Sequence, residues 1–84
     1  MREIEVNQEV NPQAGPWLEA NQINPRSCLA YPKPVVGRGL IAYVELVLFE
    51  DGRPRLINPE IEHLGSHKRL VVVPLMAAPE DYKL

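Results

Sequence analysis

The sequence predicts a small, mainly β domain: an antiparallel sheet of roughly three to five strands with one short helical turn, wrapped by a proline-rich arm. Two apolar runs with β-branched and aromatic residues, 40–49 and 70–75, carry this prediction, since such residues suit the pleated surface of a sheet. Between them, Asp51-Gly52 is a strong hairpin signal. A partly open barrel of SH3-like or OB-like character fits the same strands, and the sequence leaves both forms open.

The run 40–49 is the central strand of this interpretation. Its alternate positions are apolar on both faces, interrupted only by Glu45, so cover is needed on both sides. Leu, Ala and Glu also favour a helix, but Gly39 before the run and Asp51-Gly52 after it favour a strand. The run 67–75 is the second strong strand, and we expect it to pair with the first.

The segment before the central strand has two parts that differ in composition. Residues 2–6 predict a short edge strand, with Ile4 and Val6 on one face. Residues 11–37 form the proline-rich arm, with a single helical turn at 16–21. The arm is too apolar for a solvated linker, so we expect it to lie across one face of the sheet. Its Trp17 and Leu18 should then cover the face made by the following residues: Ile41, Tyr43, Val47 and Phe49.

After the central strand, Asp51-Gly52 predicts a tight two-residue hairpin loop with Gly52 at positive φ. The return strand is 53–57, weakened by Pro54. Residues 58–65 predict a short helix or 3₁₀ turn that begins at an N-cap asparagine and ends at a glycine. Residues 77–84 predict a frayed C-terminal tail.

Composition limits the class of protein. A chain of 84 residues is one small domain, residues 1–84, and its net charge of −2 gives no bulk attraction to nucleic acid or anionic lipid. A single Cys28 allows no internal disulfide and indicates a reducing compartment. We see no signal peptide, and the longest apolar run is about half of a membrane span, so we expect a cytoplasmic protein without a membrane segment.

Neither a catalytic nor a metal site is predicted. His63 and His67 with Cys28 contain metal-ligating atoms, but Gly65 should end the helix between the histidines and a second cysteine is lacking. Cys28 has no sequence signature of a nucleophile. We therefore expect a protein that is not an enzyme and uses no cofactor.

Two groups of residues are candidate binding surfaces. Glu45 is a mid-strand carboxylate that must be exposed, paired or functional, and pairing with an Arg or Lys of a neighbouring strand is the simplest account. The candidate partner-binding residues are Trp17, Tyr31, Tyr43, Glu45 and Phe49. The candidate anion or nucleic-acid patch is Arg53, Arg55, Lys68 and Arg69.

The function expected from the sequence is a non-enzymatic binding or accessory module that acts through protein–protein contacts. One alternative is a subunit of an enzyme whose active site another chain completes. Another is a small nucleic-acid-binding β-barrel, against which the acidic balance counts. The two apolar strands demand more cover than one small chain supplies, so we expect a protein partner or a homodimer.

Overall fold

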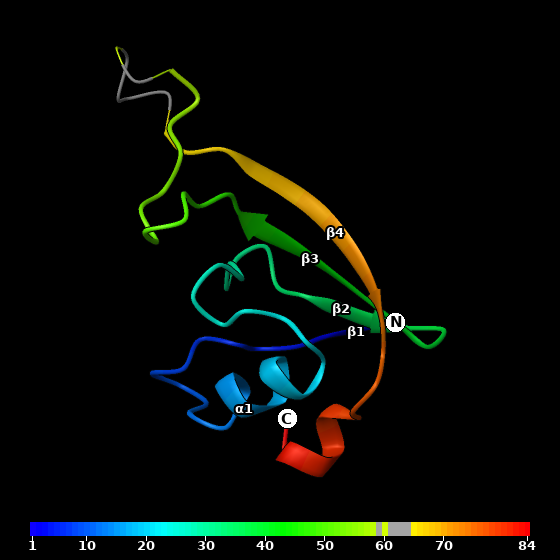
Figure 1. Cartoon of the computed structure of the whole chain (residues 1–84). Helices are drawn as coiled ribbons and strands as arrows, with labels where there is room; N and C mark the ends of the chain where they lie inside the picture. The colour runs from blue at the N-terminus through cyan, green and yellow to red at the C-terminus, as the bar shows by residue number, and fades with distance from the viewer. Residues whose placement is uncertain (59, 61–64) are drawn as a thin grey trace.

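The computed structural model describes residues 1–58, 60 and 65–84. Its centre is one open antiparallel sheet with the strand order β1-β2-β3-β4 (Figure 1). The strands are β1 Arg2–Glu3, β2 Val35–Gly37, β3 Leu40–Leu46 and β4 Lys68–Pro74, and the helices are α1 Ala14–Ala20 and the 3₁₀ helix η2 Pro79–Tyr82. The predicted mainly β fold is confirmed in its open-sheet form. The sheet does not close into a barrel, because β1 and β4 lie at its two edges.

One face of the sheet holds the hydrophobic core. Ile41 and Tyr43 of β3 are 0 % and 5 % exposed, and they belong to the same buried cluster as Trp17 and Leu18 of α1. The prediction that the arm covers this face is confirmed for these residues. It is wrong for Phe49, which is 49 % exposed, because β3 ends at Leu46 and Phe49 belongs to the hairpin beyond it.

The arm has more regular structure than the sequence predicts. The helix is seven residues long and begins at Ala14, two residues before Pro16, which is tolerated in a first turn whose N–H groups need no helical partner. The end of the arm forms β2, a strand that the sequence interpretation missed. Between them, Ser27 and Leu29 exchange backbone hydrogen bonds with Leu46 and Val44, at 2.7 and 2.9 Å. The arm therefore extends the sheet beside the second half of β3.

The C-terminal residues are not a frayed tail. Residues 79–82 form η2, and Tyr82 and Leu84 pack against the core. Asn21 at the end of α1 is 1 % exposed and holds the chain that leads into η2: its Oδ1 accepts the N–H groups of Met76 and Ala77, at 2.8 and 2.9 Å. The indole N–H of Trp17 donates to the carbonyl of Ala77 at 2.9 Å.

Two hairpins use different turns. Arg38 and Gly39 have φ values of 53° and 74° and link β2 to β3, the pattern of a tight two-residue loop. Asp51-Gly52 does form a hairpin tip, with Gly52 at φ 87°, as predicted. The loop has three residues instead of two, because the amide of Phe49 pairs with the carbonyl of Arg53 at 2.8 Å.

The return segment 53–57 is not a continuous strand; it makes single bridges, Pro54 with Leu48 and Leu56 with Ser66. The hairpin and this segment extend away from α1 and η2 (Figure 1), and the molecule measures 43 × 24 × 20 Å. Of the predicted helix at 58–65, residues 59 and 61–64 lie outside the described part of the chain. Within it, the Asn58 side chain accepts the Glu60 amide at 3.0 Å, and Gly65 has a φ of 83°.

Candidate functional site

The first candidate surface is the face of the sheet opposite α1. Because antiparallel partners share a face, the register of β3 with its neighbours assigns the residues of this face. We call it the open face; its large and small apolar residues are Val35, Leu40, Ala42, Val44, Leu46, Leu70, Val72 and Pro74. Leu40, Val72 and Leu70 are 45 %, 54 % and 71 % exposed. Three large apolar side chains of this face are therefore exposed, and the charged residues that the register places on it are Glu3 and Lys68.

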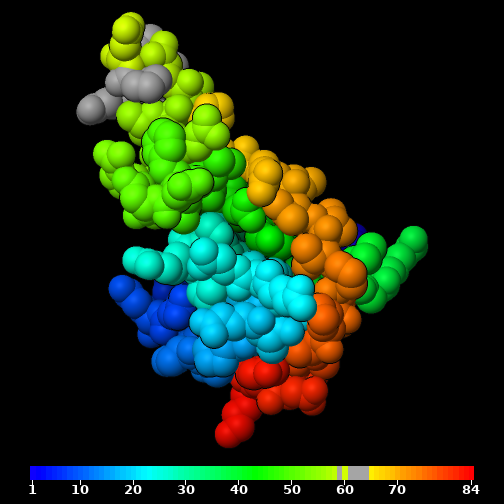
Figure 2. All heavy atoms as spheres, in the orientation of Figure 1, coloured from blue at the N-terminus to red at the C-terminus, as the bar shows by residue number. Residues whose placement is uncertain are grey.

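Exposure on the open face is greatest toward the edge of the sheet. Leu70 and Val72 belong to the edge strand β4, whereas their β3 partners Val44 and Ala42 are only half-exposed. Met76, just beyond β4, is 61 % exposed. Figure 2 shows β4, in orange, running along the surface from the yellow-green residues toward the C-terminal residues, in red. The apolar surface that lacks cover thus lies along β4.

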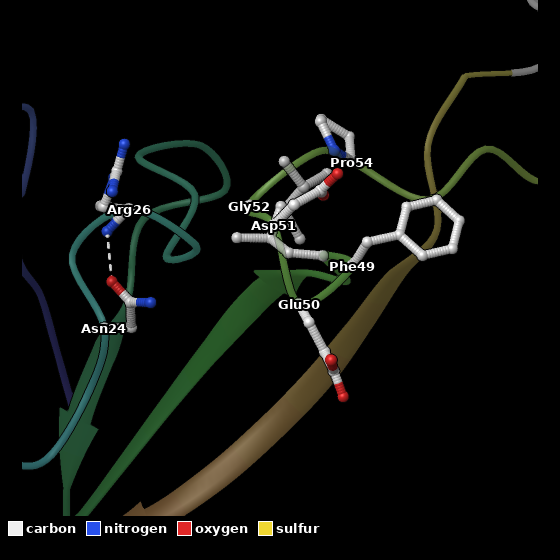
Figure 3. Close-up of a pocket in the computed structure, with 9 residues that line it drawn as sticks. Asn24, Arg26, Phe49, Glu50, Asp51, Gly52 and Pro54 are labelled. Carbon is white, nitrogen blue, oxygen red and sulfur yellow. Dashed lines mark hydrogen bonds between the residues drawn. The ribbon is translucent and has the colours of Figure 1, made fainter.

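The second candidate surface is a groove beside the hairpin tip. Its volume is about 520 Å³, and it lies between the arm and the loop 50–52 (Figure 3). It is lined by Asn24, Arg26, Leu46, Leu48, Phe49, Glu50, Asp51, Gly52 and Pro54. The Asp51 carboxylate is engaged by the Arg53 guanidinium at 2.6 Å, and the Asn24 side chain accepts the Arg26 amide at 2.9 Å.

The groove has no chemistry of its own beyond hydrogen bonding and charge. Its ionisable side chains are those of Arg26, Glu50 and Asp51, and it contains neither a thiol nor an imidazole. General-base catalysis needs a basic side chain that a hydrogen-bonding partner holds in place. The residues that line the groove include no such pair. The groove is therefore a weaker candidate than the open face.

The predicted basic residues do not share one surface. The guanidinium groups of Arg53 and Arg55 lie over the Phe49 ring, at 5.8 and 5.4 Å from its centre. Arg69 instead points to the core side of the sheet and binds Glu45, with N–O distances of 2.7 and 2.9 Å. Lys68 shares the open face with Leu46. Of the four predicted basic residues, Arg53 and Arg55 thus lie together, around the Phe49 ring.

Glu45 forms an ion pair with Arg69 of the neighbouring strand, which is the simplest of the roles expected from the sequence. Its neighbours Cys28 and Tyr43 both have raised pKa values. Burial, followed by the charge of Glu45, raises the pKa of the Cys28 thiol to about 11, and the same two causes raise the pKa of Tyr43. Because the thiolate is the nucleophile, a thiol that stays protonated at neutral pH is a poor catalyst. Cys28, Tyr43, Glu45 and Arg69 thus form a structural cluster.

The predicted partner-binding residues have different environments. Trp17 and Tyr43 lie in the core, so their expected contact with a partner is not supported by their position: covering the sheet requires them inside. Tyr31 is 60 % exposed, and its hydroxyl donates to Glu5 at 2.9 Å. This hydrogen bond is the largest cause that lowers the pKa of Glu5 and raises the pKa of Tyr31. Phe49 remains accessible on the hairpin.

Sequence reasoning missed the residues that dominate the exposed apolar surface. Leu40, Leu70 and Val72 were interpreted only as parts of buried strands. Their signal was the number of apolar strand faces, which exceeds the apolar segments available to cover them.

In the described part of the chain, no group of three or more His, Cys, Asp or Glu residues is placed to hold a metal ion. The described helices include none with the length and hydropathy of a membrane span. Comparison with protein-family models, curated proteins and solved structures finds no match for this chain.

Proposed function

We propose that this protein is a non-enzymatic binding or accessory module that acts through protein–protein contacts made by the open face. The observation that carries the proposal is the exposure of Leu70 and Val72, 71 % and 54 %, in the middle of a regular strand. Contiguous exposed apolar surface on a small domain is typical of interaction sites, because leaving it in water is unfavourable. The single Cys28 supports a reducing, cytoplasmic setting.

The proposal explains why one side of the sheet is so thoroughly covered and the other is not. The core side uses α1, the arm and η2, which leaves no further described segment for the open face. A partner protein supplies the missing cover. In the alternative in which another chain completes an enzyme, the same face is the docking surface for that chain.

Nucleic-acid binding is the second candidate, and Arg53 and Arg55 around Phe49 favour it. Arginine beside an accessible aromatic ring is a common element of single-strand binding sites. Against it stand the net charge of −2 and the pairing of Asp51 with Arg53 in the same loop. Such a site would bind weakly and lose its affinity with salt.

The test separates the two surfaces by paired variants of the full chain. One variant carries Leu70→Lys and Val72→Lys, and its matched control carries Arg53→Ala and Arg55→Ala. Both sets replace exposed side chains, so both variants should fold, which circular dichroism checks. Each protein is immobilised and used to capture cross-linked proteins from a lysate of the source cells, and is also passed over heparin and a single-stranded oligonucleotide.

We expect the lysine variant to lose protein capture at least about tenfold, as a few anchor residues dominate most interfaces. The arginine variant should capture as the parent does. The reverse pattern, with salt-sensitive retention on heparin that depends on the arginines, would contradict the proposal and favour nucleic-acid binding.

A further inference from the structure

We infer that the free edge of β4 pairs with β4 of a second copy of this chain, in an antiparallel register centred on Val71. This inference rests on the proposed function and names its partner. It starts from the position of β4, which has β3 on one side and no described strand on the other. Unpaired strand edges present rows of N–H and C=O groups that are ready to pair with another strand.

The hydrogen-bond phase of β4 shows which backbone groups are free. The amide of Leu75 donates to the carbonyl of Gly39, on the β3 side, and the carbonyl of His67 accepts the amide of Val47 on that same side. In an antiparallel ladder alternate residues point to opposite sides, so Lys68, Leu70 and Val72 direct their N–H and C=O groups outward. Pro74 directs only a carbonyl outward, since it has no N–H.

The ends of the strand select the register. With Val71 opposite its own copy, Leu70 pairs with the partner's Val72, and Lys68 pairs with the partner's Pro74. All seven residues of the strand then overlap, and Pro74 lies at the end of the ladder, where its missing N–H leaves only the Lys68 carbonyl unpaired. Two copies related in this way are symmetric, which is the commonest form of assembly in soluble proteins.

Charge supports the same arrangement. The basic residues of β4, Lys68 and Arg69, lie at one end of the strand, and the other end is uncharged. An antiparallel register places each basic end beside the uncharged end of the other copy, whereas a parallel one would place like charges side by side, which is unfavourable.

The pairing covers the outer flank of the most exposed side chains of the open face. Leu70 and Val72 lie on the uncovered face and also lack an outer strand neighbour. In the pair, Leu70 of one copy lies directly opposite Val72 of the other on the same face, about 5 Å away between Cβ atoms. A partner that packed flat against the open face would cover the already half-exposed β3 residues equally. The gradient of exposure toward β4 therefore favours pairing at the edge.

The experiment measures association and register with the full chain. Sedimentation equilibrium of the parent protein from about 1 to 500 µM should show the mass rising from one 9.5 kDa chain toward twice that value, as expected for a small interface. Val72→Pro removes an outward N–H and no bond to β3, so it should raise the dissociation constant at least tenfold. Its control, Val72→Ile, keeps both the N–H and a β-branched apolar side chain and should dimerise within about threefold of the parent.

A cysteine pair in a Cys28→Ala background tests the register independently, and it decides the matter if Val72→Pro fails to fold. Val71→Cys places two thiols directly opposite, at a Cα separation of about 4.5 Å that suits a disulfide. Val73→Cys places them about 13 Å apart, since Val73 lies opposite the partner's Arg69. Oxidation should cross-link the first variant at least tenfold more than the second.

Several results would overturn the inference. They are a monomer at all concentrations, a dimer that Val72→Pro leaves intact, or cross-linking at residue 73 equal to that at 71. A monomer that still captures a different protein through Leu70 and Val72 also overturns it, while the proposed function stands. Loss of both self-association and capture would reject the two together.

Discussion

The two faces of the same sheet have opposite surroundings although the same strands build them. On β3, Ile41 and Tyr43 are buried under α1, while Leu40, one position away, is 45 % exposed. On β4, Val71 and Val73 pack on the core, and Leu70 is 71 % exposed. Side-chain alternation assigns residues to faces, but only the rest of the chain decides which face is covered. Apolar residues on both faces therefore do not show by themselves which face the chain covers.

The largest loss of stability should come from truncating Trp17, which is buried under the covered face of the sheet. Trp17→Ala deletes a fully buried indole and its 2.9 Å hydrogen bond to Ala77, so we expect a loss of about 3–5 kcal/mol in the free energy of unfolding. Urea denaturation followed by circular dichroism measures it. The matched control is Phe49→Ala, which removes a half-exposed ring on the hairpin and should cost less than about 1 kcal/mol. Equal losses would show that the hairpin is as tightly packed as the core.

A smaller loss should follow from cutting the tie between α1 and the chain that leads to η2. Asn21→Ala leaves the amides of Met76 and Ala77 without their side-chain acceptor in a partly buried site, which should cost about 1–3 kcal/mol. Glu19→Ala, on the exposed side of the same helix, is the control and should stay within about 0.5 kcal/mol. Parent-like stability of the Asn21 variant would mean that the C-terminal residues do fray, as the sequence suggested.

Substitution of Gly52 should affect the hairpin more than the rest of the molecule. Gly52 has a φ of 87° with open space around it, so Gly52→Val adds backbone strain without a clash, on the order of 1–3 kcal/mol. Gly52→Asn is the control, because asparagine tolerates this conformation better. Since the hairpin extends away from the core, faster exchange of the Phe49 and Gly52 amides should appear first. Unchanged exchange in the valine variant would show that the chain does not turn at Gly52.

An effect confined to alkaline conditions should be a dependence of stability on pH. The folded-state pKa of Cys28 is raised from 9.0 to about 11, so the folded state favours the protonated thiol. The resulting stabilisation is present below pH 9 and is lost as the pH rises toward 11. Comparison of the parent with Cys28→Ala isolates this contribution from that of Tyr43, whose pKa is also raised. Identical pH profiles above 9 would contradict it.

Local signals in the sequence predicted most of the fold. Strand-forming composition predicted β3 and β4, and Asp51-Gly52 predicted a hairpin tip. The length of α1, the strand β2 and the packing of η2 were not predicted, because each depends on tertiary contacts: β2 on its pairing with β3, and η2 on Asn21. Short elements carry little periodicity of their own.

The candidate site was predicted less well than the fold. Counting apolar faces predicted that cover would be lacking, and placing the arm over Ile41 and Tyr43 left the opposite face short of it, but the residues of that face were not named as a site. Trp17 and Tyr43 were candidates because aromatic residues are common at interfaces, and the same residues are common in cores. Arg69 was assigned to a basic patch from its neighbour Lys68, although adjacent strand residues point to opposite faces, and its partner Glu45 lies on the core side.

Amide hydrogen exchange along β4 at two protein concentrations tests the central claim most directly. The amides of Val71 and Val73 point to β3 and should be protected at both concentrations. The outward amides of Leu70 and Val72 should exchange quickly at about 5 µM and at least tenfold more slowly at about 500 µM, when the edge is paired. Fast exchange of Leu70 and Val72 at both concentrations would contradict the account, because the edge and its apolar side chains would then stay in water.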